Sequence, residues 1–215
     1  MSFRRVWSRF GGGRTLGPSP GAVEAWHQGR RWWHVVVVAV SDPAVRARRE
    51  ALDAAFHDVL SPFCADTPHV TLFVHGFVEA PERVAPHPAE GSLVDVDIGP
   101  VNAFSSCVFL EVRGAELRRL RGEASLVPEA RTAAWRPHLT VGLFRRDQSA
   151  APVAARLRAF RQLNPLSVRG VLQTGFVDAL HPLRPLRLLG ETPTLGTSSG
   201  EDEESPMGLA DRPPS

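Results

Sequence analysis

Apolar and polar positions follow the same pattern twice along the chain. The first copy begins with a continuous apolar run over 34–40, which predicts a buried strand. Apolar residues then recur with a helical period over 43–59, and Asp42 followed by Pro43 predicts the start of that helix. A second strand, predicted over 69–77, closes the copy.

The second copy has the same order of elements. A strand is predicted over 107–112, and a helix follows whose apolar residues fall on one face. These residues are Leu117, Leu120, Ala124 and Val127. A strand over 138–144 closes this copy as well. A repeated strand–helix–strand unit predicts two similar lobes related by a pseudo-twofold axis.

Each copy is expected to gain one more strand. Residues 93–98 alternate with period two, and 101–104 continue them. After the second copy come a short helix, with Val153, Leu157 and Phe160 on one face, and a strand near 168–177. The fold class predicted from these elements is α+β.

The two ends differ in composition from the repeat. Residues 1 to about 22, within the N-terminal segment 1–29, are rich in Gly, Pro, Ser and Arg without a period, and 191–215 contain the acidic run 201–204. Such segments cannot bury enough apolar surface to offset the entropy lost on ordering. We therefore predict a single domain over 30–190 between a disordered N-terminal segment and a disordered acidic tail.

Composition narrows the class of protein only slightly. The formal net charge is only +2, so the overall charge does not indicate a protein that coats nucleic acid. All 25 basic residues are Arg. The apolar run Trp32–Val40 is too short to span a bilayer and contains His34. Cys64 and Cys107 lack metal-site or redox spacing, which indicates reduced thiols in a cytoplasmic protein without a membrane partner.

Both copies close on Pro-His-apolar-Thr-apolar, and this is the motif that carries chemistry. Because side chains alternate along a strand, His69 and Thr71 share one face, as do His138 and Thr140. The intervening apolar residues face the helices. A single His-x-Thr is common by chance, but two at equivalent points of a repeat, each after Pro, are rarely coincidental.

Two imidazoles and two hydroxyls suit the cleavage of a phosphodiester. Attack at phosphorus needs a base on the attacking oxygen and an acid on the leaving oxygen. An imidazole serves either role near neutral pH. Threonine hydroxyls can donate to the non-bridging oxygens as charge develops there. No metal and no cofactor is needed for this chemistry.

These motifs resemble those of the two-histidine (2H) phosphoesterase superfamily, and within it the bacterial 2′-5′ RNA ligase-like proteins, also called RNA 2′,3′-cyclic phosphodiesterases. The segment 135–141 (WRPHLTV) is similar to the second HxTx motif of that family. The resemblance implies a bilobal fold in which a mostly antiparallel sheet in each lobe lines a central groove, with helices outside. It also implies that His69 and His138 are catalytic, that Thr71 and Thr140 bind phosphate, and that the substrate is an RNA terminus or a small nucleotide bound to a monomer.

Four further residues are candidates for substrate binding. His75, Phe73 and Phe144 fall on the motif face if the strands stay regular, and Arg136 precedes the second motif. Aromatic rings can stack on unpaired bases, and Arg can bind a phosphate. Gly76 next to His75 also predicts a bulge that would break this alternation.

Two other functions stay open at this stage. A metalloprotein could use His69, His75, His138 and Cys64 as ligands, although their spacing is not that of a known zinc motif. A non-catalytic module could bind RNA or nucleotides in the same groove.

Overall fold

The computed structural model describes residues 2–18, 24–25, 27–61, 67–123, 135–181 and 186–189. Its helices and strands, in chain order, are α1 (Phe3–Gly11), β1 (Arg14–Thr15), β2 (Trp32–Ala39), α3 (Pro43–Ala55), β3 (His69–Val78), the 3₁₀ helix η1 (Pro81–Arg83), β4 (Leu93–Ala103), β5 (Cys107–Arg113), α4 (Ala115–Glu123), β6 (His138–Leu143), β7 (Gln148–Ser149), α6 (Ala150–Leu157), the 3₁₀ helix η2 (Arg158–Gln162), β8 (Leu166–Asp178) and β9 (Arg187–Leu188).

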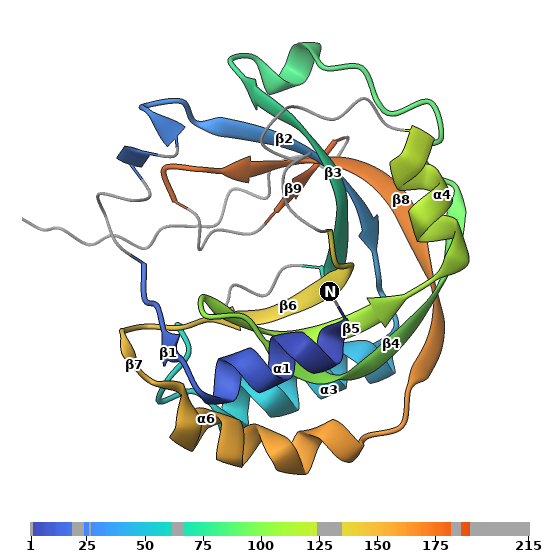
Figure 1. Ribbon diagram of the computed structural model, residues 1–215. Helices are drawn as coiled ribbons and strands as arrows, with labels where there is room; N and C mark the ends of the chain where they lie inside the picture. The colour runs from blue at the N-terminus through green and yellow to red at the C-terminus, as the bar shows by residue number, and fades with distance from the viewer. Residues whose placement is uncertain are drawn as a thin grey trace, which may run out of the picture.

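Six antiparallel strands close into one ring. They are hydrogen-bonded in the order β2-β3-β6-β5-β4-β8, and β2 also pairs with β8 along its whole length (Figure 1). The short strand β9 pairs with the end of β8. In Figure 1, α1, α3 and α6 gather on one side of the ring and α4 lies apart from them.

The two copies exchange their third strands. β4 follows the first copy in sequence but pairs with β5 of the second, and β8 follows the second copy but pairs with β2 of the first. The halves β3-β2-β8 and β6-β5-β4 are equivalent, and they join at the β4–β8 and β3–β6 edges. The prediction of an α+β fold with antiparallel strands is confirmed. The prediction of two lobes with separate sheets is wrong, because both edges of each half are paired.

The helices pack where the apolar pattern places them. The Asp42 side chain accepts hydrogen bonds from the backbone N–H groups of Ala44 (2.8 Å) and Val45 (3.2 Å), which confirms the predicted start of α3. The apolar face of this helix is buried in the main core, as are Leu117 and Leu120 of α4 and one face of α6. Ala124 and Val127, predicted for the second helix, lie outside the described residues.

The N-terminal segment is part of the fold. Val6 and Phe10 of α1 are buried, and the Phe10 ring stacks on Phe144 at a centroid distance of 5.8 Å. The following strand β1 pairs with β7. The structure differs here from the expected disorder of residues 1–29. The apolar residues of 3–10 form a helical stripe too short to stand out among the surrounding Arg, Gly and Ser. The predicted acidic tail, 191–215, lies outside the described residues.

We predict that Thr15→Val lowers the free energy of unfolding by about 1–3 kcal/mol. Thr15 is fully buried, and its hydroxyl donates to the Arg146 carbonyl (2.8 Å) and accepts from the Gln148 N–H (3.1 Å). Valine keeps the shape but leaves both partners unsatisfied. Chemical denaturation measures the change, with Ser8→Ala on the exposed face of α1 as control. Equal stability of Thr15→Val and wild type would mean that this segment is not docked in solution.

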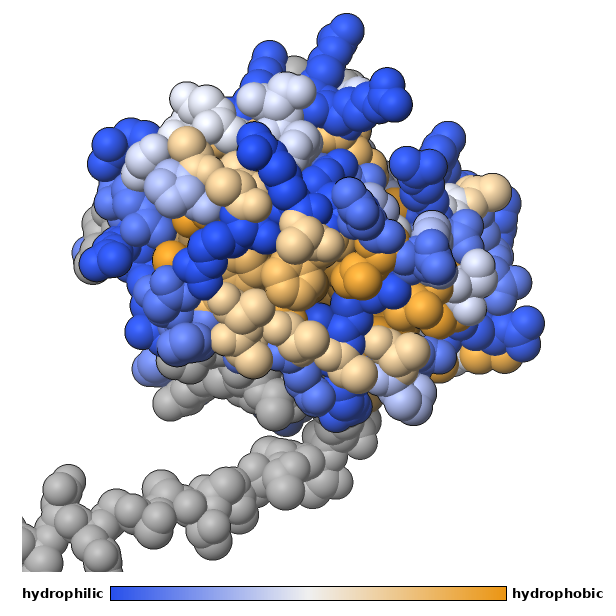
Figure 2. All heavy atoms as spheres, turned by 90° about the horizontal axis from the view of Figure 1, so that it is seen from below, coloured by the Kyte–Doolittle hydropathy of each residue, from blue (hydrophilic) through white to orange (hydrophobic). Residues whose placement is uncertain are grey.

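The outer face of α3 and α6 is built from small apolar and long basic side chains. Figure 2, which views the molecule from the side of these helices, shows an apolar area crossed by hydrophilic side chains. Several alanines of these two helices are exposed, among them Ala47, Ala51, Ala151 and Ala155. In the described ranges, the large hydrophobic residues that are exposed are Leu16, Leu93, Leu163 and Leu180, none of them in these helices. No helix in these ranges has the length and apolar composition needed to cross a membrane.

Candidate active site

The two motif strands meet at one residue pair. β3 and β6 are antiparallel, with Val70 opposite Leu139, the middle residue of each His-x-Thr. Both of these apolar side chains are fully buried in the main core. Their neighbours therefore point to the other face of the sheet. The antiparallel register places His69 across from Thr140 and Thr71 across from His138. All four side chains are half-buried.

Each histidine is held by the same local contacts. His69 Nδ1 lies 3.1 Å from the Thr67 carbonyl oxygen, and His138 Nδ1 lies 2.8 Å from the Arg136 carbonyl oxygen. A carbonyl oxygen only accepts, so Nδ1 carries the proton in both rings and Nε2 carries the lone pair of the neutral form. The proline before each histidine is also held in place. The Pro68 carbonyl accepts a hydrogen bond from the Val40 N–H, and the Pro137 carbonyl accepts one from the Val112 N–H.

Both motif strands bulge one residue after the threonine. In β3, Thr71 and Phe73 face the consecutive residues Val37 and Val36, which leaves Leu72 as the extra residue. In β6, Thr140 and Gly142 face the consecutive residues Phe109 and Val108, which leaves Val141 as the extra residue. A bulge moves all later side chains to the opposite face.

The bulges correct two predicted site residues. Phe73 and Phe144 were expected on the motif face, and this prediction is wrong, because both are buried in the main core. Val74 and Leu143 take the positions on the motif face instead, where they pack against side chains of β2 and β5 respectively.

Aromatic residues surround the second histidine. The rings of Phe104 and Phe109 each lie edge-on to His138 at a centroid distance of 5.2 Å. Phe109 corresponds in the repeat to Val37, beside Thr71. Burial in these surroundings lowers the pKa of His138, the Arg136 carbonyl raises it, and the positive charge of His69 lowers it further. His138 is therefore favoured in its neutral form.

Sequence analysis assigned no structural role to three residues around the second motif, Trp135, Glu111 and Asn102. Trp135 crosses to the first motif, where its indole N–H donates to the Thr71 carbonyl (3.2 Å). Glu111 of β5 lies opposite His138 in the β5–β6 register and is almost fully buried. Its carboxylate accepts a 2.7 Å hydrogen bond from the Asn102 amide. The equivalent of Glu111 in the first copy is Ala39. A charged residue within an apolar strand run was the available signal for Glu111.

His75 lies on the opposite face of the sheet from the two motifs. A second bulge at His75, next to Gly76 with φ of 108°, turns the strand as the glycine predicted. The His75 ring stacks on His34 at 4.5 Å and meets Phe73 edge-on at 5.1 Å. Burial and then the charge of His87 lower the pKa of His75. The structure does not bring His75 to His69, and His75 is not part of the candidate site.

His34 makes the folded protein sensitive to acid. Its side chain is buried, no residue that the structure describes forms a hydrogen bond with its Nε2, and burial followed by the charge of His75 lowers its pKa to about 4. The unfolded chain binds this proton near pH 6.5. The free energy of unfolding therefore falls as pH falls from about 6.5 to about 4.

We predict that this group lowers stability by about 2 kcal/mol between pH 7.5 and pH 5. Urea unfolding at both pH values measures the loss. His34→Phe should lose correspondingly less, and His57→Phe, at an exposed histidine, should behave as wild type. If His34→Phe and wild type lose the same free energy, the acid sensitivity arises elsewhere.

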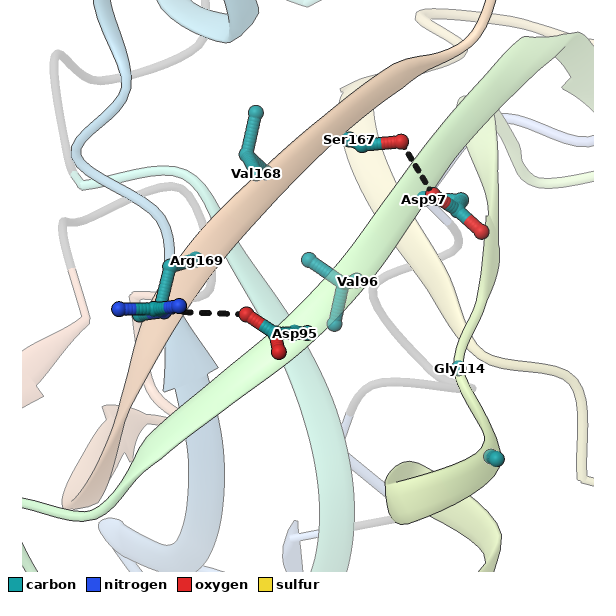
Figure 3. Close-up of a pocket in the computed structure, with 8 residues that line it drawn as sticks. Asp95, Val96, Asp97, Gly114, Ser167, Val168 and Arg169 are labelled. Carbon is teal, nitrogen blue, oxygen red and sulfur yellow. Dashed lines mark hydrogen bonds and ion pairs between the residues drawn. The ribbon is translucent and has the colours of Figure 1, made fainter.

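One hollow in the surface contains none of the predicted residues. It has a volume of about 470 Å³ and lies over β4, β8 and the start of α4 (Figure 3). Its polar groups are paired with one another, since Arg169 binds Asp95 at 3.0 Å and the Ser167 hydroxyl donates to Asp97 at 2.7 Å. Neither motif strand contributes to it.

The metalloprotein alternative finds little support in the residues that are described. Among them, no group of three or more His, Cys, Asp and Glu side chains is placed to hold a metal ion. Cys64 lies outside the described residues. Cys107 is a buried thiol whose pKa is raised to about 12 by burial.

The fold and the paired motifs define an α+β protein with a duplicated His-x-Thr site. The model of the 2′-5′ RNA ligase superfamily matches residues 61–171, just over half of the chain and inclusive of both motifs. The chain belongs to this superfamily, as its resemblance to the 2H phosphoesterases implied.

A solved structure similar to this chain is that of E. coli LigT complexed with NADP+. The two proteins are 17% identical over 68% of this chain and 87% of the LigT chain, with a TM-score of 0.32. A comparison with curated protein sequences finds no significant match.

Proposed function

We propose that this protein is a phosphodiesterase that hydrolyses 2′,3′-cyclic phosphate or 2′-5′-linked ends of RNA or nucleotides, with His69 and His138 as its acid and base. The observation that carries the proposal is the pairing of Val70 with Leu139. This register sets two imidazoles and two hydroxyls beside one another on one face of the sheet.

In the proposed reaction, water attacks the phosphorus of the cyclic ester. One Nε2 takes the proton from the water, and the other donates a proton to the ribose oxygen that leaves. The lowered pKa of His138 favours this residue as the base, and the positive charge on the acid His69 is consistent with that lowering. Thr71 and Thr140 donate to the non-bridging oxygens, where negative charge grows.

The proposal is tested by turnover of a defined panel. Nucleoside 2′,3′-cyclic monophosphates, an RNA oligomer ending in a cyclic phosphate and a 2′-5′-linked dinucleotide are incubated with the full chain in excess EDTA, and products are assigned by ³¹P NMR. We expect a monophosphate product at a rate that EDTA does not change. Loss of activity that zinc or magnesium restores would favour the metalloprotein alternative. Tight binding without turnover would favour a non-catalytic binding module.

A further inference from the structure

A basic hollow adjoins the second motif. Its volume is about 370 Å³, and α1, the turn after α1, the β4–β5 turn and Arg136 form its walls. Three arginines line it, Arg9, Arg14 and Arg136, and among the residues that the structure describes no acidic one does. It is therefore a cationic site by composition, in a chain whose net charge is only +2.

The hollow shares two residues with the immediate surroundings of His138. Phe104 lines it and also touches the His138 ring edge-on. Arg136 lines it, and the Arg136 carbonyl binds His138 Nδ1. A ligand whose phosphorus lies at the two histidines can therefore reach the hollow by passing Phe104.

The backbone that carries Arg9 and Arg14 is fixed. Between these two residues, the Gly13 carbonyl accepts from the Ala150 N–H at 3.1 Å. Just after them, Thr15 is fully buried, and the Leu16 N–H donates to the carbonyl of Ser105 in the opposite wall at 2.7 Å. The walls are thus tied together by main-chain bonds, and the hollow does not depend on the position of one mobile side chain.

The charges of Arg9 and Arg14 are available to a ligand. Both side chains are exposed, and within the part of the chain that the structure describes neither makes an ion pair or a hydrogen bond through its side chain. A larger hollow of about 650 Å³, at the N-terminal end of α1, is also lined by arginines, but the carboxylate-bearing residue Glu111 lines it as well. The buried Glu111 carboxylate lies 3.6 Å from the Arg161 guanidinium and offsets part of the positive charge there.

We propose that this hollow binds a second phosphate group of the substrate, on the 5′ side of the nucleoside whose 2′,3′-cyclic phosphate reacts. Guanidinium groups match phosphate oxygens in geometry and charge. Phe104 lies between the two phosphate positions, where a ribose or base can stack on it. The inference rests on the proposed function and specifies its substrate as a nucleotide with at least two phosphates.

The kinetic test compares matched substrates. They are adenosine 2′,3′-cyclic phosphate, its 5′-phosphorylated form, and an ApA dinucleotide with a terminal cyclic phosphate. The variant is the double substitution Arg9→Gln with Arg14→Gln. The control, Arg5→Gln with Arg46→Gln, removes the same charge from exposed positions that do not line this hollow.

We expect wild type to prefer the substrates with a second phosphate, by the ratio of kcat/KM values. In the Arg9/Arg14 variant this ratio should be about tenfold lower or more, because charged hydrogen bonds to the second phosphate are lost. In the control the ratio should not change. If the variant loses only the preference for the 5′-phosphorylated nucleotide, the second phosphate belongs to a free nucleotide. If it loses only the preference for the dinucleotide, the second phosphate belongs to RNA. An unchanged ratio, or an equal fall in the control, overturns the proposal.

Calorimetric binding separates this inference from the proposed function. Adenosine 2′,5′-bisphosphate should bind wild type more tightly than adenosine 2′-monophosphate, and the Arg9/Arg14 variant should lose most of the difference. If no cyclic phosphate is hydrolysed but this difference is found, the phosphate subsite stands and the proposed function fails. If the two ligands bind equally to wild type, the subsite is refuted whatever the turnover.

Discussion

His69→Ala and His138→Ala are each expected to lower kcat on a 2′,3′-cyclic phosphate by about 10²–10⁴-fold, the usual contribution of a positioned acid or base. The two imidazoles flank the same residue pair, and each is oriented by a backbone carbonyl two residues before it. The double variant should lose much less than the product of the single losses, because the two groups act as one unit. Steady-state kinetics on the three proteins measures these effects.

The matched control is His57→Ala, at an exposed histidine whose ring bonds the Ala54 carbonyl. It should turn over substrate as wild type does. Because His69 and His138 are only half-buried, both variants should stay folded, and thermal unfolding checks this. A folded His138→Ala protein with the wild-type rate would show that the second motif is structural, and the paired mechanism would be abandoned.

The pH profile of the same variants assigns the roles. A base acts when deprotonated, so kcat/KM falls on the acidic side as the base gains its proton, and an acid sets the alkaline side. The lowered pKa of His138 favours it as the base in the proposed mechanism. His138→Ala should therefore flatten the acidic limb of a bell-shaped profile, and His69→Ala the alkaline limb. The reverse outcome would exchange the two roles while leaving the mechanism in place.

Periodicity predicted most of the framework. The alternation over 93–98, the apolar runs of the two copies and the Asp42-Pro43 start each correspond to an element of the structure. Each of these signals is local, because a strand or helix shows in the spacing of its own apolar residues. Strand exchange between the copies is not local. Nothing within β4 or β8 specifies that each pairs with the other half, and this pairing is what closes the ring.

The candidate site was predictable up to the threonines and not beyond them. His69 with Thr71, and His138 with Thr140, precede the bulges, so the simple alternation of a strand places them correctly. Phe73, His75 and Phe144 follow the bulges and fall on the other face. Leu72 and Val141, the extra residues, are ordinary apolar strand residues, and no glycine directly follows Leu72, although Gly142 follows Val141. The aromatic surroundings of His138 come from the β4–β5 turn and adjoining β5, which only the closed sheet brings to β6.

Thr71→Val and Thr140→Val should each lower kcat by about 10–10³-fold, the effect of losing one donor to a developing charge. Valine preserves the shape and the β-branched fit of the strand, so the loss reports the hydroxyl alone. Because the donor acts on charge that appears only in the transition state, kcat and kcat/KM should fall together.

Thr71→Ser and Thr140→Ser are the matched controls, since they keep the hydroxyl and lose only a methyl group. The antiparallel register sets each threonine across from the histidine of the other copy. Compared with wild type, the two valine variants should be slower but should keep the shape of the pH profile, because neither substitution removes an ionising group. Serine variants as impaired as the valine variants would mean that the methyl packing matters and the hydroxyl does not. In that case the phosphate would have to be bound by other donors, and the symmetric use of the two motifs would be wrong even if both histidines proved essential.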